Sequence, residues 1–127
     1  MCIRDSSITV HPKVWGEEHW IVNKEYCGKL LIIHKGYRCS IHYHKKKDET
    51  FYLVKGKILM EINGQPRVMK PGDKQYIAPG TKHRFTGLEE SELIEFSTHH
   101  EEEDSYRDTQ SGPVPPEEFT QLINRYG

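Results

Sequence analysis

Histidine is unusually frequent in this chain, with 8 residues among 127, and its spacing predicts metal binding. His42 and His44 are two positions apart in a stretch of alternating polar and apolar residues. On a β-strand, residues at that spacing face the same side with Cα atoms about 6.6 Å apart, so both imidazoles can reach one ion. Glu49 opens the next apolar run, and His83 follows a Pro-Gly turn. We therefore predict a site for one divalent ion held by these four side chains.

The types of the four ligands indicate which ion they would hold. Three imidazoles and one carboxylate form a borderline set that suits Mn, Fe, Co, Ni or Zn and disfavours Ca or Mg. We expect Mn, with Zn, Fe, Co or Ni as alternatives. An isolated histidine on a strand is usually a surface or core residue, so the prediction depends on the whole set of four and on the glycines that frame it.

The stretch that carries the two histidines has an unusual distribution of polarity. One face of residues 38–44 is polar, and the other carries Cys39, Ile41 and Tyr43. An ordinary half-buried strand turns its apolar row inward, whereas here the polar row contains the metal ligands. We therefore expect the polar row to line an enclosed cavity, a local break of pattern that is typical of functional sites. The apolar row must then be covered by a second layer or by a partner chain, which favours a homodimer.

The elements that would position these residues are β-strands. Short apolar runs between residues 15 and 98 are broken about every 8 to 12 residues by Gly, Pro or Asn, as in a sandwich or small barrel. Leu30–Ile33 is apolar on both faces and is predicted to be a buried strand. Asn63-Gly64 predicts a tight hairpin. The predicted strands are Trp20–Val22, Leu30–Ile33, Arg38–His44, Thr50–Val54, Lys57–Ile62 and Glu92–Ser97.

The rest of the chain divides into two further parts. Residues 1–14 form an N-terminal segment, part of which we expect to be non-native, and residues 99–127 form a C-terminal extension with a polar loop and a connector. Apolar residues recur at helical spacing over residues 117–126, which predicts a short helix that packs on the sheet or on a partner subunit. The fold class is therefore all-β with a short C-terminal helix.

Composition excludes several classes of protein. A length of 127 residues suits one domain. The 18 basic and 19 acidic side chains give a net charge of −1, so we expect no nucleic-acid partner. No apolar run approaches the length of a membrane span, and residues 1–6 lack the apolar core of a secretory signal. Three widely spaced cysteines argue against a disulfide framework and for a cytoplasmic location.

The motifs resemble those of the cupin superfamily. The first cupin signature is matched by Gly36, His42, His44, Glu49 and Gly56, and the second by Gly72, Gly80 and His83. Ala78 stands where proline is usual and Gly87 where asparagine is usual, but neither is a ligand. The resemblance covers residues 15–98. It implies a double-stranded β-helix barrel with His42, His44, Glu49 and His83 on the metal, and it often implies dimers.

Within that superfamily the chain is similar to sugar isomerases. Residues 26–29, 47–51, 81–83 and 95–98 look like the D-lyxose isomerase type of cupin, and residues 15–16 and 94–104 look like the cupin domain of type II mannose-6-phosphate isomerases. The resemblance implies an aldose–ketose isomerase acting on a small sugar, similar to D-lyxose or D-mannose, or on a sugar phosphate. Cupins share one fold across many chemistries, so the function has to be argued from the site.

Such a reaction needs a base and groups that hold the open-chain substrate. Glu95 lies between two apolar residues, so its carboxylate either points into the cavity as the base, where burial would raise its pKa, or is a solvated strand residue. Lys47 is either a proton donor or part of a solvated lysine run. The acidic run 101–104 would repel a phosphate and so favours a neutral sugar. Candidates for substrate binding are Arg38, Lys29, Lys82 and His99, the last on a polar loop or a flap.

Two other functions fit the same residues. An Fe(II) dioxygenase uses a similar ligand set with open positions for O₂. A non-catalytic sugar-binding cupin would need the cavity but not the base.

Overall fold

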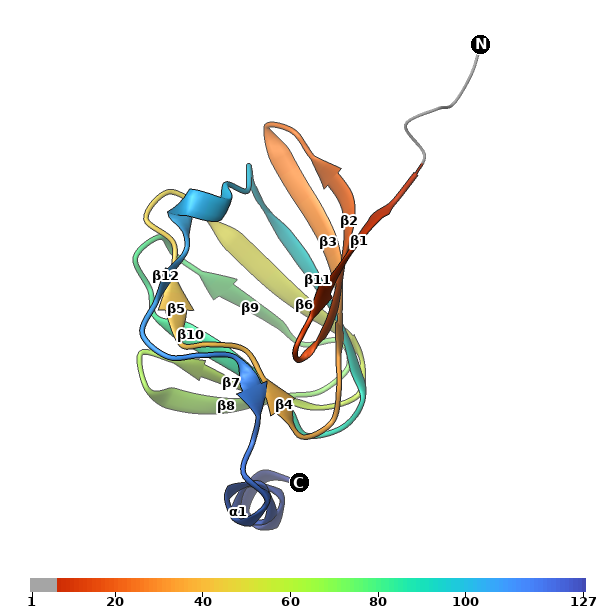
Figure 1. Cartoon of the computed structure of the whole chain (residues 1–127), viewed down its shortest axis with the longest axis vertical. Helices are drawn as coiled ribbons and strands as arrows, with labels where there is room; N and C mark the ends of the chain where they lie inside the picture. The colour runs from red at the N-terminus through yellow and green to blue at the C-terminus, as the bar shows by residue number, and fades with distance from the viewer. Residues whose placement is uncertain (1–6) are drawn as a thin grey trace.

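The computed structural model describes residues 7–127, so our expectation that part of the N-terminus is non-native lies, for residues 1–6, outside the described residues. Two antiparallel sheets face each other (Figure 1). The first sheet has six strands in the spatial order β1 (Thr9–Lys13), β2 (Gly16–Asn23), β3 (Tyr26–Ile33), β11 (Ser91–Thr98), β6 (Glu49–Lys55) and β9 (Lys74–Ile77). The second contains, in order, β12 (Tyr106–Arg107), β5 (His42–Tyr43), β10 (His83–Gly87), β4 (Tyr37–Arg38) and β13 (Gly112–Pro113), with β7 (Ile58–Ile62) and β8 (Gln65–Met69) paired beside β10. This is the double-stranded β-helix arrangement, and it confirms the all-β fold class.

The inner face of the first sheet changes from apolar to polar along its strands. Leu31, Leu93 and Leu53 lie side by side on β3, β11 and β6, and each is at most 2% exposed. Two residues further along the same strands, Lys29 pairs with Glu95, and both side chains are buried. One end of the space between the sheets is therefore an apolar core, and the other is a polar cavity.

The strand at Leu30–Ile33 corrects one expectation. Leu31 and Ile33 are buried on the inner face, but Leu30 and Ile32 are only half-buried on the outer face. In an antiparallel sheet one face can remain outside the core.

Two glycines allow the close approach of neighbouring segments. Gly56 has φ +93°, and a Cβ there would lie 2.4 Å from the Glu90 carbonyl oxygen. At Gly87 a Cβ would lie 2.6 Å from the backbone oxygen of His34. Gly87 departs from the usual cupin residue, and this contact gives a steric reason for a residue without a side chain.

The stretch Arg38–His44 is not the single strand that the sequence predicts. Residues 39–41 lie between β4 and β5 and belong to neither strand. Two of their backbone N–H groups donate to side chains of the C-terminal extension: Ser40 N to Ser111 Oγ, and Ile41 N to Thr109 Oγ1. Strict alternation is lost here, so Cys39 and Ser40 are both buried. Tyr43 stacks on Tyr106 of β12, so the extension of the chain itself covers part of the row that we assigned to a second layer or a partner.

The C-terminal extension runs along the second sheet before it ends in a helix. A 3₁₀ turn, η2 (Glu102–Asp104), precedes β12, and β13 pairs with β4. The division at residues 15–98 stays a prediction, although β1, β12 and β13 lie outside it and pair with strands inside it.

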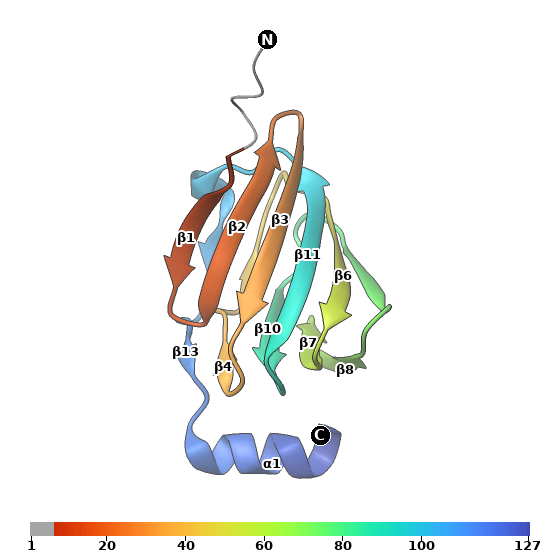
Figure 2. The same cartoon turned by 90° about the vertical axis from the view of Figure 1, so that its right-hand side faces the viewer.

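The predicted helix is confirmed as α1 (Pro116–Tyr126), which lies beyond one end of the sheets (Figure 2). None of its residues is buried, and Arg38 holds it by donating two hydrogen bonds to the Glu118 carboxylate, at 2.6 and 3.3 Å. Within residues 7–127 no helix has the length and apolar character that a membrane span requires.

The apolar end of the core gives a direct test of this fold. We expect Leu93→Ala to lower the free energy of unfolding by about 2–5 kcal/mol, because it opens a cavity in the apolar core between the two sheets. Val14 is 53% exposed, so Val14→Ala should change it by less than about 0.5 kcal/mol. Urea unfolding of the two variants measures both values, and equal effects would contradict the packing described here.

Candidate metal centre

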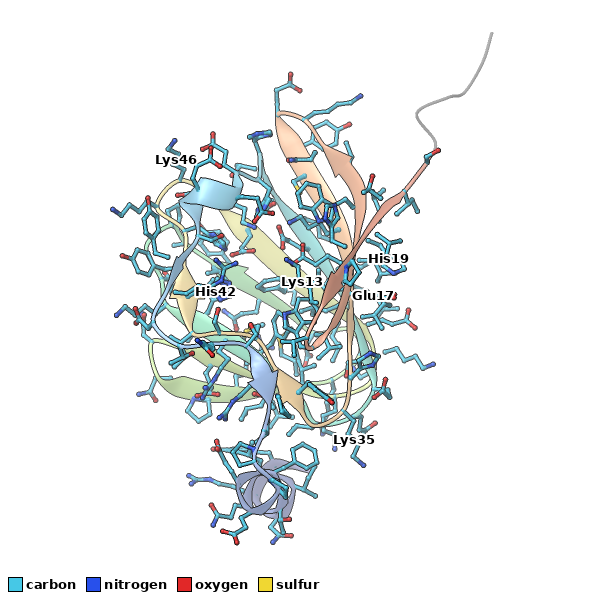
Figure 3. The ribbon with its side chains drawn as sticks, in the orientation of Figure 1. Lys13, Glu17, His19, Lys35, His42 and Lys46 are labelled. Atoms are coloured by element: carbon cyan, nitrogen blue, oxygen red, sulfur yellow. The ribbon has the colours of Figure 1, made fainter. Side chains whose placement is uncertain are left out.

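Three histidines from two strands converge between the sheets. His42 on β5 pairs directly with His83 on β10, and His44 follows the end of β5. One ring nitrogen from each of the three lies within 4.8 Å of the others. Figure 3 shows His42 among the side chains between the sheets. The antiparallel pairing of β5 and β10 therefore joins ligands that are far apart in the sequence.

Hydrogen bonds fix the orientation of each imidazole. Nδ1 of His42 donates to the carbonyl of Ser40 at 2.8 Å, and Nδ1 of His83 donates to that of Thr81 at 2.9 Å. His44 Nδ1 donates to the carbonyl of Asp104 at 3.0 Å. A carbonyl can only accept, so Nδ1 carries the hydrogen and Nε2 keeps a free lone pair. This is the arrangement of metal-binding histidines, whose second nitrogen is fixed by an outer partner.

Glu49 completes the cluster from the first sheet. Its Oε2 lies 3.4 Å from His44 Nε2 and 3.3 Å from His83 Nε2. Both Glu49 Oε2 and His83 Nε2 are buried without a hydrogen-bond partner within the described part of the chain. Buried polar atoms are nearly always paired, so two unpaired atoms that face each other need a shared partner. A divalent transition metal fits this requirement and this set of donors.

Burial also keeps two of the candidate ligands in the neutral form that a metal ion requires. It lowers the pKa of His42 to about 3, and the neighbouring His83 adds to that shift. The pKa of His44 is likewise lowered, first by burial and then by the charge of Lys47. Both rings are therefore neutral near pH 7, as ligation requires.

A buried ion pair lies directly beside the ligands. Lys47 Nζ donates to Glu95 Oε2 at 2.9 Å and to His100 Nδ1 at 3.1 Å, and it lies 3.7 Å from Glu49 Oε1. Lys47 is 3% exposed and Glu95 is 5% exposed. Lys47 therefore connects Glu49, a candidate ligand, with a second carboxylate in the same cavity.

The charge state of Glu95 differs from the sequence-based expectation. Burial alone would raise its pKa, but the charge of Lys47 and then that of Lys29 outweigh burial and lower the pKa to about 2. The expected raised pKa is therefore wrong, because single-residue reasoning did not include two lysines in the same cavity. Glu95 rests as a carboxylate that also accepts a hydrogen bond from Ser97 Oγ at 3.0 Å.

A second lysine enters the cavity from β3. Lys29 is 1% exposed and donates to Glu18 Oε1 at 3.3 Å. Its ammonium group lies 4.3 Å from the centre of the Trp20 ring, and Trp20 Nε1 donates to the same Glu18 oxygen at 2.9 Å. His100 meets the edge of that indole. The cavity thus contains a second ion pair, Lys29 with Glu18, in addition to Lys47 with Glu95.

Comparison with known proteins agrees with this geometry. The family profile described as a cupin domain matches residues 29–99. The chain belongs to the cupin family.

Two proteins of similar sequence are named as isomerases. D-lyxose ketol-isomerase of Cohnella laeviribosi is 30% identical over 129 residues, which cover 79% of this chain and 71% of that protein. D-lyxose/D-mannose isomerase of Thermosediminibacter oceani is 26% identical over 125 residues, which cover 76% and 69%. Among solved structures, KdgF from Halomonas sp. has a TM-score of 0.69 at 18% identity and covers 80% of this chain and 94% of that one, a likeness of fold.

Seven of the sequence-predicted site residues come together in this part of the cupin fold. His42, His44, Glu49, Lys47, Glu95 and Lys29 line the cavity, and His83 lies in one cluster with His42 and His44. Their roles in binding and catalysis stay predictions.

The other three candidates for substrate binding lie elsewhere. Arg38 turns to Glu118 at the base of α1, and Lys82 pairs with Asp108 at 2.7 Å on the surface. His99 is exposed and donates from Nδ1 to the Lys24 carbonyl. These three side chains therefore do not join the cluster around the histidines, and their role in substrate binding stays a prediction.

His100 takes the place that was predicted for His99. Alternation along β11 would turn His99 inward, but the strand ends at Thr98. The side chain of Asn23 then fixes the backbone of His100: Asn23 Oδ1 accepts from His100 N at 2.9 Å, and Asn23 Nδ2 donates to the His100 carbonyl at 3.2 Å. Glu18 and Trp20 were also missed. They reach the cavity because the register of β2 pairs them with Leu31 and Lys29, two inward-facing residues of β3.

Asp104 links the C-terminal extension to the metal ligands. Its carboxylate accepts the backbone N–H groups of Lys45, Lys46 and Lys47, at 2.9 to 3.2 Å, while its carbonyl accepts from His44. Burial acts to raise the pKa of Asp104, but these three donors outweigh burial and lower the pKa. One residue of the acidic run therefore orients a ligand instead of repelling an anion.

Metal binding tests the cluster itself. We expect the wild-type chain to hold one transition ion and His83→Ala to weaken its affinity by at least about 100-fold, because even an outer-shell change costs about 10–100-fold. His34→Ala is the matched control, since His34 is exposed and bonded to Glu90. Titration with Co²⁺, followed by absorbance and by elemental analysis, measures both. Equal affinity in the two variants would contradict the site.

The stabilisation by Asp104 should depend on pH. A carboxyl whose pKa is lowered on folding stabilises the protein above its unfolded pKa, near 3.9, and loses that contribution as the pH falls through the folded pKa. We expect Asp104→Asn to destabilise the metal-free chain at pH 7, and the difference from wild type to shrink below about pH 4. The control variant is Glu103→Gln. Because Glu103 is exposed, this variant should show no such pH-dependent difference in stability from wild type. Thermal unfolding across pH measures it, and a constant difference down to the lowest pH would count against this role.

Proposed function

We propose that this cupin is a metal-dependent aldose–ketose isomerase acting on a small free sugar similar to D-lyxose or D-mannose. The observation that carries the proposal is the buried pair of Lys47 and Glu95 next to the cluster of His42, His44, His83 and Glu49. In this proposal Glu95 moves the proton and Lys47 holds a sugar oxygen, and both lie beside the site where a metal ion would act as a Lewis acid. The two similar isomerases support the same reaction class.

Isomerisation moves a proton between C1 and C2 of the open-chain sugar. A bound metal ion supplies polarisation of the carbonyl and the adjacent hydroxyl. In the proposed reaction the Glu95 carboxylate takes the proton from C2 of the aldose and returns it to C1, while the proton of the C2 hydroxyl passes to the C1 oxygen. Lys47 donates a hydrogen bond to a sugar oxygen, and this contact weakens its own hold on Glu95. The basicity of Glu95 then rises from its low resting value, because the lysine charge is what lowers the pKa.

The charges in the cavity favour a neutral sugar over a sugar phosphate. Lys47 pairs with Glu95, and Lys29 pairs with Glu18. Glu102, which also lines the cavity, bonds to His100. A phosphate would have to break one of these pairs and would meet carboxylates nearby. Hydroxyl groups can bond to both signs of charge without that cost.

The finer points of the proposal are the ion, the location and the assembly. We propose Mn as the ion, since the donor set of three imidazoles and one carboxylate suits it. We also propose a cytoplasmic enzyme that works as a homodimer and needs no nucleic-acid or membrane partner. The near-neutral charge of −1 supports the last point.

A ketose assay with Mn-loaded protein tests the activity. We expect conversion of D-lyxose or D-mannose to the ketose, and less conversion of the corresponding phosphates. Glu95→Gln should lower kcat by about 10²–10⁴-fold while the metal content stays unchanged, because it removes only the base. Glu25→Gln, on the exposed turn before β3, is the matched control.

Three outcomes would overturn the proposed function. Oxygen uptake by the Fe-loaded protein, followed with an oxygen electrode, would instead indicate a dioxygenase. Sugar binding without turnover, equally strong in wild type and in Glu95→Gln, would indicate a non-catalytic binding protein. Unchanged sugars from a fully metal-loaded chain would exclude the isomerase.

A further inference from the structure

The C-terminal extension supplies part of the wall of the cavity. Figure 1 shows its strand β12 beside β5, which carries His42. Four side chains of the extension line the cavity: Glu102, Ser105, Arg107 and Ser111. All four follow residue 99, where the match to the cupin profile ends, whereas the four candidate metal ligands lie within that match. The extension therefore adds polar groups that do not belong to the matched cupin domain.

Alternation along β12 turns Arg107 toward the histidines. Tyr106 stacks on a tyrosine of β5, and the residues on either side of it point to the opposite face of the strand. Ser105 Oγ lies 3.4 Å from Nδ1 of His44. Arg107 pairs with His42 in the ladder between β12 and β5, so its side chain leaves the strand on the same side as that imidazole. The extension thus places Ser105 and Arg107 beside the cluster of histidines.

The guanidinium group of Arg107 is free within the described part of the chain. Three other arginines, Arg38, Arg67 and Arg84, each pair with a carboxylate. Arg107 is exposed and forms no ion pair or side-chain hydrogen bond with any of residues 7–127. A guanidinium carries five N–H donors in a planar fork. Arg107 therefore presents a set of donors at the cavity that a bound molecule can use.

Exposure increases from the metal ligands to Arg107. Glu49 and Lys47, beside the histidines, are 2% and 3% exposed. The side chain of Glu102 is 61% exposed, and Arg107 is exposed as well. The first two residues mark the inner end of the cavity, and the other two mark its mouth. A chain molecule whose reacting carbons lie at the inner end therefore extends its other end toward Arg107 and Glu102.

Opposite charges at the mouth suit hydroxyl groups. Glu102 Oε1 accepts a hydrogen bond from His100 Nε2 at 3.2 Å, and Glu102 Oε2 has no hydrogen bond within the described residues. Arg107 and Glu102 form no ion pair with each other, although both line the cavity. A hydroxyl can accept from the guanidinium and donate to the carboxylate, whereas an anion would be repelled by the carboxylate. The mouth therefore favours a hydroxylated end of a ligand over a phosphate or a carboxylate.

We propose that Arg107 and Glu102 form a distal subsite for the hydroxyl groups of an open-chain sugar, and that Arg107 makes this subsite selective for six carbons over five. The inference rests on the proposed function for the placement of C1 and C2 at the metal ligands. It concerns ligand binding, however, and does not require turnover. In this subsite Arg107 donates to the terminal hydroxyl, and the free oxygen of Glu102 accepts from the same end of the sugar.

Two sugars of the proposed class differ only at the end that this subsite would contact. D-mannose has the carbon skeleton and the hydroxyl configuration of D-lyxose, with one more hydroxymethyl group at the end remote from C1. With C1 and C2 at the metal ligands, the sixth carbon extends furthest toward the mouth. A hydrogen bond from a charged donor to the hydroxyl on that carbon is worth about a factor of ten in affinity. Arg107 thus distinguishes the two sugars without contacting the reacting carbons.

Titration calorimetry of the full metal-loaded chain with two polyols tests the subsite. D-mannitol and D-arabinitol are the reduced forms of D-mannose and D-lyxose, so they remain open chains and are not isomerised. We expect wild type to bind D-mannitol about 10-fold more tightly than D-arabinitol. Arg107→Ala should raise the Kd for D-mannitol about 10-fold and the Kd for D-arabinitol by less than about 2-fold. Arg125→Ala, which changes an exposed arginine on α1, is the matched control and should bind both polyols as wild type does.

Further measurements separate this role from a structural one. Arg107 is exposed and has no side-chain partner among residues 7–127, so Arg107→Ala should fold, and circular dichroism checks this. Arg107→Lys keeps the charge but not the planar fork, so it should lose only part of the affinity for D-mannitol. In the isomerase assay Arg107→Ala should raise KM for D-mannose about 10-fold with little change in kcat, because the contact is equally strong in the ground state and the transition state.

The subsite and the reaction can fail separately. Polyol binding with the expected selectivity, but without sugar turnover, would support the subsite and exclude the isomerase. Sugar turnover in which Arg107→Ala weakens D-mannose and D-lyxose equally, or not at all, would exclude the subsite and leave the reaction standing. A wild-type chain that binds neither polyol also overturns the subsite. If D-mannose 6-phosphate binds more tightly than D-mannitol, and Arg107→Ala abolishes the difference, the mouth is a site for an anion and the assignment to hydroxyl groups is wrong.

Discussion

The site depends on one constraint: each of the three imidazoles gives its Nδ1 hydrogen to a backbone carbonyl, so that each Nε2 lone pair is free. The carbonyls come from three different segments, at Ser40, Thr81 and Asp104. The unpaired Glu49 Oε2 and His83 Nε2 face each other as a result. A metal ion can bind several of these lone pairs at once. A water molecule in the same place would have to donate a separate hydrogen bond to each of them.

The buried charges beside the ligands are balanced by pairing. Lys47 with Glu95 and Lys29 with Glu18 form two ion pairs in a cavity that is also lined by apolar side chains such as Leu31 and Phe51. Each charge would be costly to bury alone, so the lysines and carboxylates depend on each other. The same pairing lowers the pKa of Glu95, and a ligand that engages Lys47 would release it. In the proposed reaction, substrate binding and proton transfer are therefore connected through Lys47.

The sequence predicted the ligands better than their surroundings. The spacing of His42 and His44, the Pro-Gly turn before His83 and the glycine pattern were enough for the all-β fold, for the helix at residues 117–126 and for the convergence of four side chains. It did not predict the break at residues 39–41, because the partners are Thr109 and Ser111 far along the chain. His100 and Asp104 were missed for the same reason: long-range hydrogen bonds determine their positions.

The account is tested most directly by diffraction from crystals of metal-loaded protein at the absorption edge of the added transition metal. It predicts one strong anomalous peak between the two sheets, about 2.0–2.2 Å from Nε2 of His42, His44 and His83 and from a carboxylate oxygen of Glu49. The account is contradicted if a fully loaded crystal has no peak there, or if the peak lies beyond bonding distance of those four side chains.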